Sequence, residues 1–113
     1  MRTRVVNIRK ERADVYIGRP PRGHGIPDPP ARGCFGNPFA METEADREES
    51  LRRYALYFLQ RVETDEVFRE AVLALRGKAL GCFCKPKRCH GDIIAEWLDR
   101  YEIGREGVLY AAK

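Results

Sequence analysis

The sequence lacks long hydrophobic runs. A membrane-spanning helix needs about 20 apolar residues, and no apolar segment approaches that length. Residues 1–14 are basic but contain no apolar core of the kind found in a secretory signal. Internal repeats are also missing. Neither sign of charge dominates, because 21 basic and 17 acidic side chains leave a net charge of +4. Such a charge does not by itself indicate a nucleic-acid partner. We expect a cytoplasmic protein with no membrane contact.

The chain is short and contains only four cysteines. A length of 113 residues indicates one domain, and 43% hydrophobic with 34% charged residues is typical of globular proteins. Without a secretory signal the cysteines are expected to be reduced thiols. Cys82 and Cys84 are too close along one strand for an unstrained disulfide. A disulfide between Cys34 and one of the other cysteines could form only in an oxidising compartment.

Three short apolar runs predict the strands of an α/β fold. Residues 4–8 and 14–18 are rich in β-branched side chains, and we expect them to pair as an antiparallel hairpin. Residues 79–84 indicate a third, central strand. In the tail, 104–113, residues 108–110 could add an edge strand. The expected architecture is a mixed sheet of three or four strands covered by three helices, similar to a Rossmann fold only by weak analogy.

Apolar residues at helical spacing predict the three helices. The first begins at Thr43 or Asp46, the second is capped by Thr64, and the third begins at Asp92. Six of the seven prolines lie between residues 20 and 38, so the segment 19–38 is predicted to form an irregular loop.

Between the third strand and the third helix lies a loop rich in reactive side chains. Alternation along the strand puts Cys82 and Cys84 on one face and Phe83 on the other. Cys89 and His90 are expected in the bend before the helix. Ligands of open α/β sheets bind at such a place, beyond the carboxyl ends of strands and beside helix N-termini. This loop is therefore the predicted functional site.

Three kinds of site fit this loop. Zinc is one, although no metal is favoured, because adjacent Cys89 and His90 cannot readily point at one ion. Its ligands would be Cys82, Cys84, Cys89 and His90.

A reactive thiolate is the second kind of site, since a cysteine near a helix N-terminus and basic side chains has a lowered pKa. Cys82 to Arg88 also matches the C-x5-R spacing of the tyrosine-phosphatase loop, without its glycines. The third is an anion pocket, with His90 and Asp92 as acid and base groups. The alternative to all three is that Cys82 and Cys84 are simply small apolar residues packed in the core.

Three residues outside this loop are further candidates for ligand contacts. Arg19 follows the second predicted strand, and its planar guanidinium could grip a phosphate or carboxylate. A bond from Arg19 to loop carbonyls is an equal alternative. Asn37 lies in the turn that closes the long loop, and Lys78 precedes the third strand.

Several spaced motifs make the sequence similar to a known family. It resembles small uncharacterised proteins of bacteria and their phages, grouped as a domain of unknown function, over roughly residues 4–100. The resemblance rests on Ile17-Gly18-Arg19, Gly36-Asn37-Pro38-Phe39, Gly77-Lys78, Cys82-Phe83-Cys84, Pro86, Cys89, His90 and Asp92. The family implies a pattern of residues and no activity. Its members often carry neutral residues in place of Lys85, Lys87 and Arg88, which shifts weight to Cys84, Cys89, His90 and Asp92.

The leading functional hypothesis is a pocket for a nucleotide-like or other anionic small molecule. Arg19, Asn37, Cys84 and Lys78 would contact the ligand, and any catalysis would fall to Cys89, His90 and Asp92. It requires Arg19 and the cysteine–histidine corner to meet in one cavity. One alternative is a zinc module that binds nucleic acid or protein, and another is a phage-type accessory protein acting through its surface. Whether the protein is an enzyme is left open.

Overall fold

The computed structural model describes residues 3–20, 25–39 and 42–107. Along them the elements run β-β-α-α-β-α, with a short 3-10 helix before the first α-helix. This order matches the prediction, and the α/β fold class is confirmed. No helix within these residues combines the length and apolarity needed to cross a membrane.

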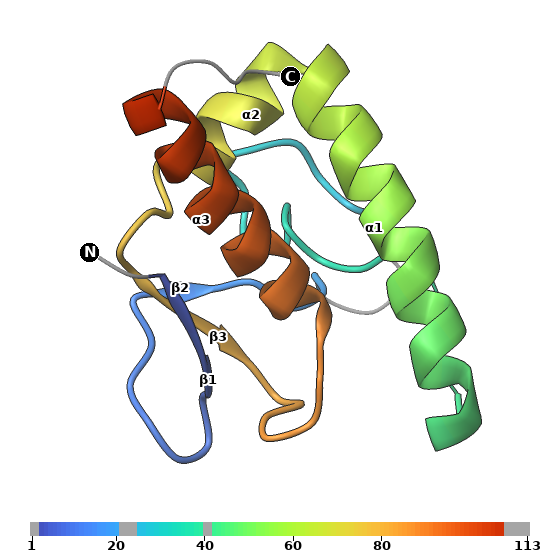
Figure 1. The fold of residues 1–113 in the computed structure, drawn as a ribbon. Helices are drawn as coiled ribbons and strands as arrows, with labels where there is room; N and C mark the ends of the chain where they lie inside the picture. The colour runs from blue at the N-terminus through green and yellow to red at the C-terminus, as the bar shows by residue number, and fades with distance from the viewer. Residues whose placement is uncertain (1–2, 21–24, 40–41, 108–113) are drawn as a thin grey trace.

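Three parallel strands form the sheet, in the order β1-β3-β2 (Figure 1). β1 (Arg4–Asn7) and β2 (Val15–Tyr16) each pair with β3 (Ala79–Cys82). The predicted central position of the third strand is confirmed, and every residue of β3 is buried. Residues 108–110, predicted as a further strand, lie outside the described residues.

The predicted antiparallel hairpin of the first two strands is wrong, because both run parallel to β3 and lie on either side of it. The connecting loop 8–14 crosses one face of β3. At its ends the amide of Ile8 donates to Cys82 O at 3.0 Å and that of Asp14 to Ala79 O at 2.8 Å. Seven residues can extend to about 23 Å, enough to cross a single strand. The crossing needs glycine in β3, since a Cβ on Gly81 would lie 2.6 Å from Ala13 Cβ.

Four helical segments lie within the described residues, and the last continues through residues 104–107, which were predicted to belong to the tail. They are η1 (Glu44–Asp46), α1 (Arg47–Thr64), α2 (Glu66–Leu73) and α3 (His90–Gly107).

The first helical segment begins where the sequence predicted, and the cap of α2 differs from the prediction. The capping box at the first helical segment pairs Thr43 with Asp46. Asp65, in place of the predicted Thr64, caps α2 by accepting the amide of Phe68 at 3.1 Å. Thr64 is still in α1 and donates its hydroxyl to Gln60 O.

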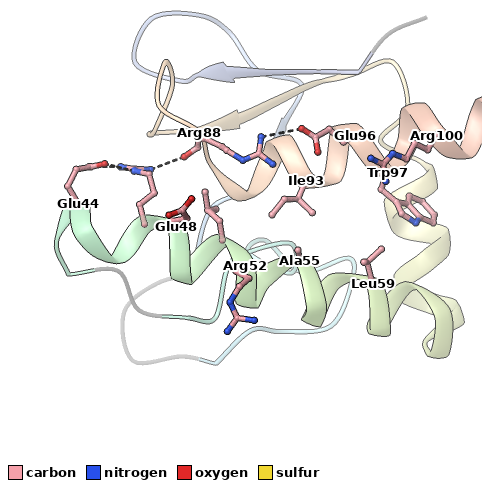
Figure 2. A pocket seen from close by; sticks show the side chains of 12 residues that line it. Glu44, Glu48, Arg52, Ala55, Leu59, Arg88, Ile93, Glu96, Trp97 and Arg100 are labelled. Carbon is pink, nitrogen blue, oxygen red and sulfur yellow. Dashed lines mark hydrogen bonds and ion pairs between the residues drawn. The ribbon is translucent and has the colours of Figure 1, made fainter.

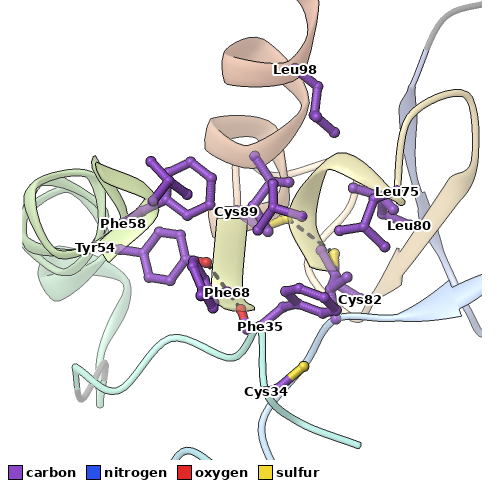
Figure 3. Packing of buried hydrophobic residues seen from close by; sticks show 14 residues of the cluster. Cys34, Phe35, Tyr54, Phe58, Phe68, Leu75, Leu80, Cys82, Cys89 and Leu98 are labelled. Carbon is purple, nitrogen blue, oxygen red and sulfur yellow. Dashed lines mark hydrogen bonds between the residues drawn. The ribbon is translucent and has the colours of Figure 1, made fainter. Parts of the chain in front are cut away.

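The helices gather on the side of the sheet opposite loop 8–14 (Figure 1). Helix α3 packs against β1 and β3, and α1 lies beside α3 (Figure 2). The core lies between these layers and is largely aromatic, with Tyr54, Phe58 and Phe68 fully buried against Leu80 (Figure 3). Burial of such rings is the main stabilising term of a domain this size. The Tyr54 hydroxyl donates to Phe35 O at 3.0 Å, which ties the long loop to the core.

Candidate functional site

The carboxyl ends of the three parallel strands meet at one edge of the sheet. Loop 8–14 follows β1, residues 17–20 follow β2, and residues 83–89 lead from β3 to α3. The cysteine loop and Arg19 therefore both begin at this edge, as a site at the end of an α/β sheet requires. Asn7, the last residue of β1, also reaches the loop and donates to Lys85 O at 2.7 Å.

Cys82 and Cys89 form a buried pair of thiols within the core (Figure 3). Their Sγ atoms lie 3.1 Å apart, and their exposed fractions are 2% and 1%. Either thiol can donate to the other sulfur. This bond lowers the pKa of Cys82, and the amides of Cys84 and Lys85 lower it further. The same bond raises the pKa of Cys89, which burial raises further. The pair is therefore asymmetric, with the negative charge favoured on Cys82.

His90 is the first residue of α3 and is buried. Its Nε2 donates to Ile17 O at 2.6 Å, and its ring meets Tyr54 edge to face at 5.1 Å between centroids. Burial lowers the pKa of His90, and the charge of Arg19 acts in the same direction. The helix can approach this closely because a Cβ on Gly91 would lie 2.6 Å from Ile17 Cδ1. His90 therefore anchors α3 to the end of β2.

Asp92 has the capping role that the sequence predicted. One carboxylate oxygen accepts the amide of Cys89 at 2.9 Å, and the other accepts Lys85 Nζ at 2.7 Å. This satisfies a free amide at the start of α3 and neutralises one of the three basic residues in the loop.

Arg19 and Asn37 lie together and hold the end of the long loop. The Arg19 guanidinium donates from Nε to Asn37 O at 2.9 Å and from Nη2 to Phe39 O at 2.6 Å. The Asn37 amide donates to Ser50 Oγ and accepts from the amide of Phe39, both at 2.9 Å. These bonds match the alternative in which Arg19 binds loop carbonyls. Whether either residue also contacts a ligand stays a prediction.

The two remaining candidates, Cys84 and Lys78, lie at opposite ends of β3. Cys84 is half-buried beside the Arg47 guanidinium, and Glu44 and then Cys84 raise the pKa of Arg47. Lys78 is exposed and directly precedes β3, so it lies at the opposite end of that strand from Cys84. Lys78 therefore does not join Arg19 and the cysteines at the carboxyl edge.

The four residues named for zinc do not converge. Over residues 3–20, 25–39 and 42–107 there is no group of three metal-ligating side chains placed to hold an ion. Tetrahedral zinc would hold two sulfurs about 3.8 Å apart, wider than the 3.1 Å of Cys82 and Cys89. The Nε2 atom of His90 already donates a hydrogen bond to Ile17 O. Zinc here would require these groups to move, and stoichiometric zinc in purified protein would reveal it.

An exposed row of rings and guanidinium groups at the same edge was missed by the sequence reasoning. The row, which we call the aromatic edge, consists of Arg9, Phe83, Tyr16 and Arg32. Arg9 lies 4.9 Å over the Phe83 ring, Phe83 meets Tyr16 edge to face at 6.2 Å, and Arg32 lies 4.2 Å over Tyr16. The one signal in the sequence was the alternation that turned Phe83 away from the cysteines.

Helices α1 and α3 also enclose a surface groove of about 580 Å³. Its floor is apolar and includes Leu51, Ile93 and Trp97. Arginine and glutamate side chains form its rim, where Arg88 pairs with Glu96 at 3.2 Å (Figure 2). Apart from the adjacent Arg88, no residue of the predicted site and none of the aromatic edge lines this groove.

Comparisons with other proteins agree with the family resemblance seen in the sequence. The profile of a family described as a domain of unknown function (DUF4326) matches residues 2–100. An uncharacterized 12.4 kDa protein from the nrdA-td intergenic region of Enterobacteria phage T4 is 35% identical over 97 residues. The match covers 86% of this chain and 78% of the phage protein. No solved structure matches the chain.

Proposed function

The chain belongs to the DUF4326 family, and we propose that it binds a nucleotide-like, anionic small molecule at the aromatic edge. The observation that carries the proposal is the Arg9–Phe83–Tyr16–Arg32 row at the carboxyl ends of the strands. The ligand class is the one indicated by the sequence, and the contact residues are revised.

The rings of the aromatic edge offer a surface for stacking. Phe83 is 48% exposed although it follows a fully buried strand, and Tyr16 is half-buried beside it. A planar base can stack on such a ring, and stacking by aromatic residues is worth about 1–3 kcal/mol per base.

The guanidinium groups supply positive charge next to these rings. Arg9 and Arg32 are exposed, and neither forms an ion pair within the described residues. Both rest on aromatic faces, which orients them without neutralising them. Each guanidinium could therefore offer charge-assisted donors to a phosphate beside a stacked base.

The proposal does not include catalysis by Cys89, His90 and Asp92. Cys89 and His90 are buried, and both Asp92 carboxylate oxygens already accept hydrogen bonds. These side chains support the loop that presents Phe83.

Thermal unfolding in the presence of ATP, GTP, CTP and UTP tests the proposal, with tripolyphosphate as a ligand without a base. At least one nucleotide should raise Tm, by an amount that corresponds to about 2.7 kcal/mol at one hundred times its Kd. Tripolyphosphate should stabilise less, because it cannot stack.

Matched variants locate the site. Phe83→Leu keeps an apolar side chain but loses the ring, and Arg9→Gln removes one charge; each should weaken stabilisation at least several-fold. Arg53→Gln is the control, since Arg53 is an exposed arginine on α1 paired with Glu49. Failure of all four nucleotides at millimolar concentration, or equal losses in Arg9→Gln and Arg53→Gln, would show the proposal to be wrong.

A further inference from the structure

The buried thiols of Cys82 and Cys89 carry an inference that is independent of ligand binding. Cys82 is the last residue of β3, and Cys89 directly precedes α3. Their sulfur atoms are 3.1 Å apart, and a disulfide requires about 2.05 Å. A movement of about 1 Å would join them, which is small for a loop of this length.

The surroundings of the pair favour a thiolate on Cys82. Its sulfur is hydrogen-bonded to the Cys89 sulfur and lies against the amides of Cys84 and Lys85. The Lys85 side chain is close enough for both sulfurs to raise its pKa. A thiolate is the form of cysteine that attacks an electrophile. Cys34 provides the contrast, because burial raises its pKa and no other cysteine in the described residues bonds to it.

We propose that Cys82 and Cys89 form a dithiol that a hydroperoxide oxidises to a disulfide. The Cys82 thiolate attacks one peroxide oxygen, the O–O bond breaks, and the leaving oxygen takes a proton to become water or an alcohol. The resulting Cys82 sulfenic acid is attacked by the Cys89 sulfur, and the S–O bond breaks with release of water. Two electrons pass from the two thiols to the peroxide, and two S–H groups become one S–S bond.

The disulfide would connect the end of β3 to the start of α3 across residues 83–88. It would form from sulfurs that already touch, so the core around them should change little. Cys84 is the competing partner by sequence, but its side chain lies beside Arg47. The geometry therefore selects Cys89 over Cys84 as the partner of Cys82.

Tryptic peptide mapping of the folded protein after hydrogen peroxide treatment tests the proposal. After peroxide treatment the protein is denatured in the presence of an alkylating reagent, which blocks every remaining free thiol, and it is then digested. Trypsin cuts after Lys78, Lys87, Arg88 and Arg100, so Cys82 lies on peptide 79–87 and Cys89 on peptide 89–100. We expect these two peptides joined with the loss of two hydrogen atoms, and separated again by dithiothreitol. Cys34, on peptide 33–47, should remain alkylated.

Serine variants identify the sulfurs. Cys84→Ser should keep the linked peptides, and Cys82→Ser should lose them. If Cys82→Ser fails to fold, fragmentation of the linked wild-type peptide places the bond on Cys82 or Cys84 instead. The proposal is overturned by a bond to Cys84 or by sulfinic acid on Cys82 without a linked peptide. It is equally overturned if wild-type protein stays fully alkylated after peroxide treatment.

Discussion

At the scale of single residues, the cysteine–histidine corner is built into the fold. The Cys89 sulfur contacts the Cys82 sulfur, and His90 donates a hydrogen bond to Ile17 O. Asp92 caps the start of α3. The residue types and the cap could be read from the sequence, because capping depends on near neighbours in the chain. The burial of His90 could not, since it depends on α3 packing against the end of β2.

The buried histidine predicts a dependence of stability on pH. Burial lowers the pKa of His90 in the folded state, with Arg19 adding to the effect and Asp92 opposing it. In the unfolded chain the pKa of His90 is about 6.5. Above that pH the imidazole is neutral in both the folded and the unfolded protein, and the contribution of the buried neutral ring to stability is fully present. As pH falls below that value the unfolded chain gains a proton that the folded protein excludes. Stability is then lost by up to about 1.4 kcal/mol per pH unit, until the folded pKa is reached.

Urea unfolding of wild type and His90→Gln between pH 7.5 and about pH 5 measures this effect. Glutamine can still donate to Ile17 O but does not titrate, and all other groups are common to both proteins. The free energy of unfolding should fall more steeply in the wild type than in the variant. Parallel curves would contradict the burial of an uncharged imidazole at this position.

At the scale of elements, the helices were more predictable than the strand pairing. Helix positions follow from periodicity within one segment, and α1 and α2 begin and end within a few residues of the predicted limits. The pairing of strands depends instead on which strand of the sheet lies between two others. Nothing near residues 4–18 indicates that β3, more than sixty residues later, separates them. A short connection favours a hairpin, and that expectation was wrong here.

The crossing of loop 8–14 over β3 makes Gly81 intolerant of a side chain. A Cβ there would meet Ala13 and Ile8, so Gly81→Ala should destabilise the protein by about 1–3 kcal/mol in urea unfolding. Gly25→Ala is the matched control, because a Cβ at Gly25 meets nothing within 4 Å. The control should be neutral or slightly stabilising. A Gly81→Ala protein as stable as Gly25→Ala would mean that the loop does not cross this face.

At the scale of the whole molecule, the parallel sheet brings together residues that are distant in the sequence. Arg9, Tyr16, Arg32 and Phe83 come from four segments and meet because three strand ends share one edge. The sequence indicated the edge through Arg19 and the cysteine loop. It could not indicate the rings, since the pairing of strands was needed to place Tyr16 beside Phe83.

The same topology explains why the predicted cavity is filled. Arg19 lies close enough to His90 to lower its pKa, so the two predicted halves do approach each other. Apolar core residues and the carbonyl of Ile17 occupy the space around the corner. The surface available to a ligand is therefore the outer face, where Phe83 and Arg9 are exposed.

Backbone amide chemical shifts, measured during titration with the most stabilising of the four nucleotides, test the proposed site most directly. Binding at the aromatic edge should shift the amides of Arg9, Tyr16, Arg32 and Phe83 most strongly, and Phe83→Leu should need at least several-fold more nucleotide to reach the same shifts. Shifts confined to the groove between α1 and α3, around Leu51 and Trp97, would contradict the account.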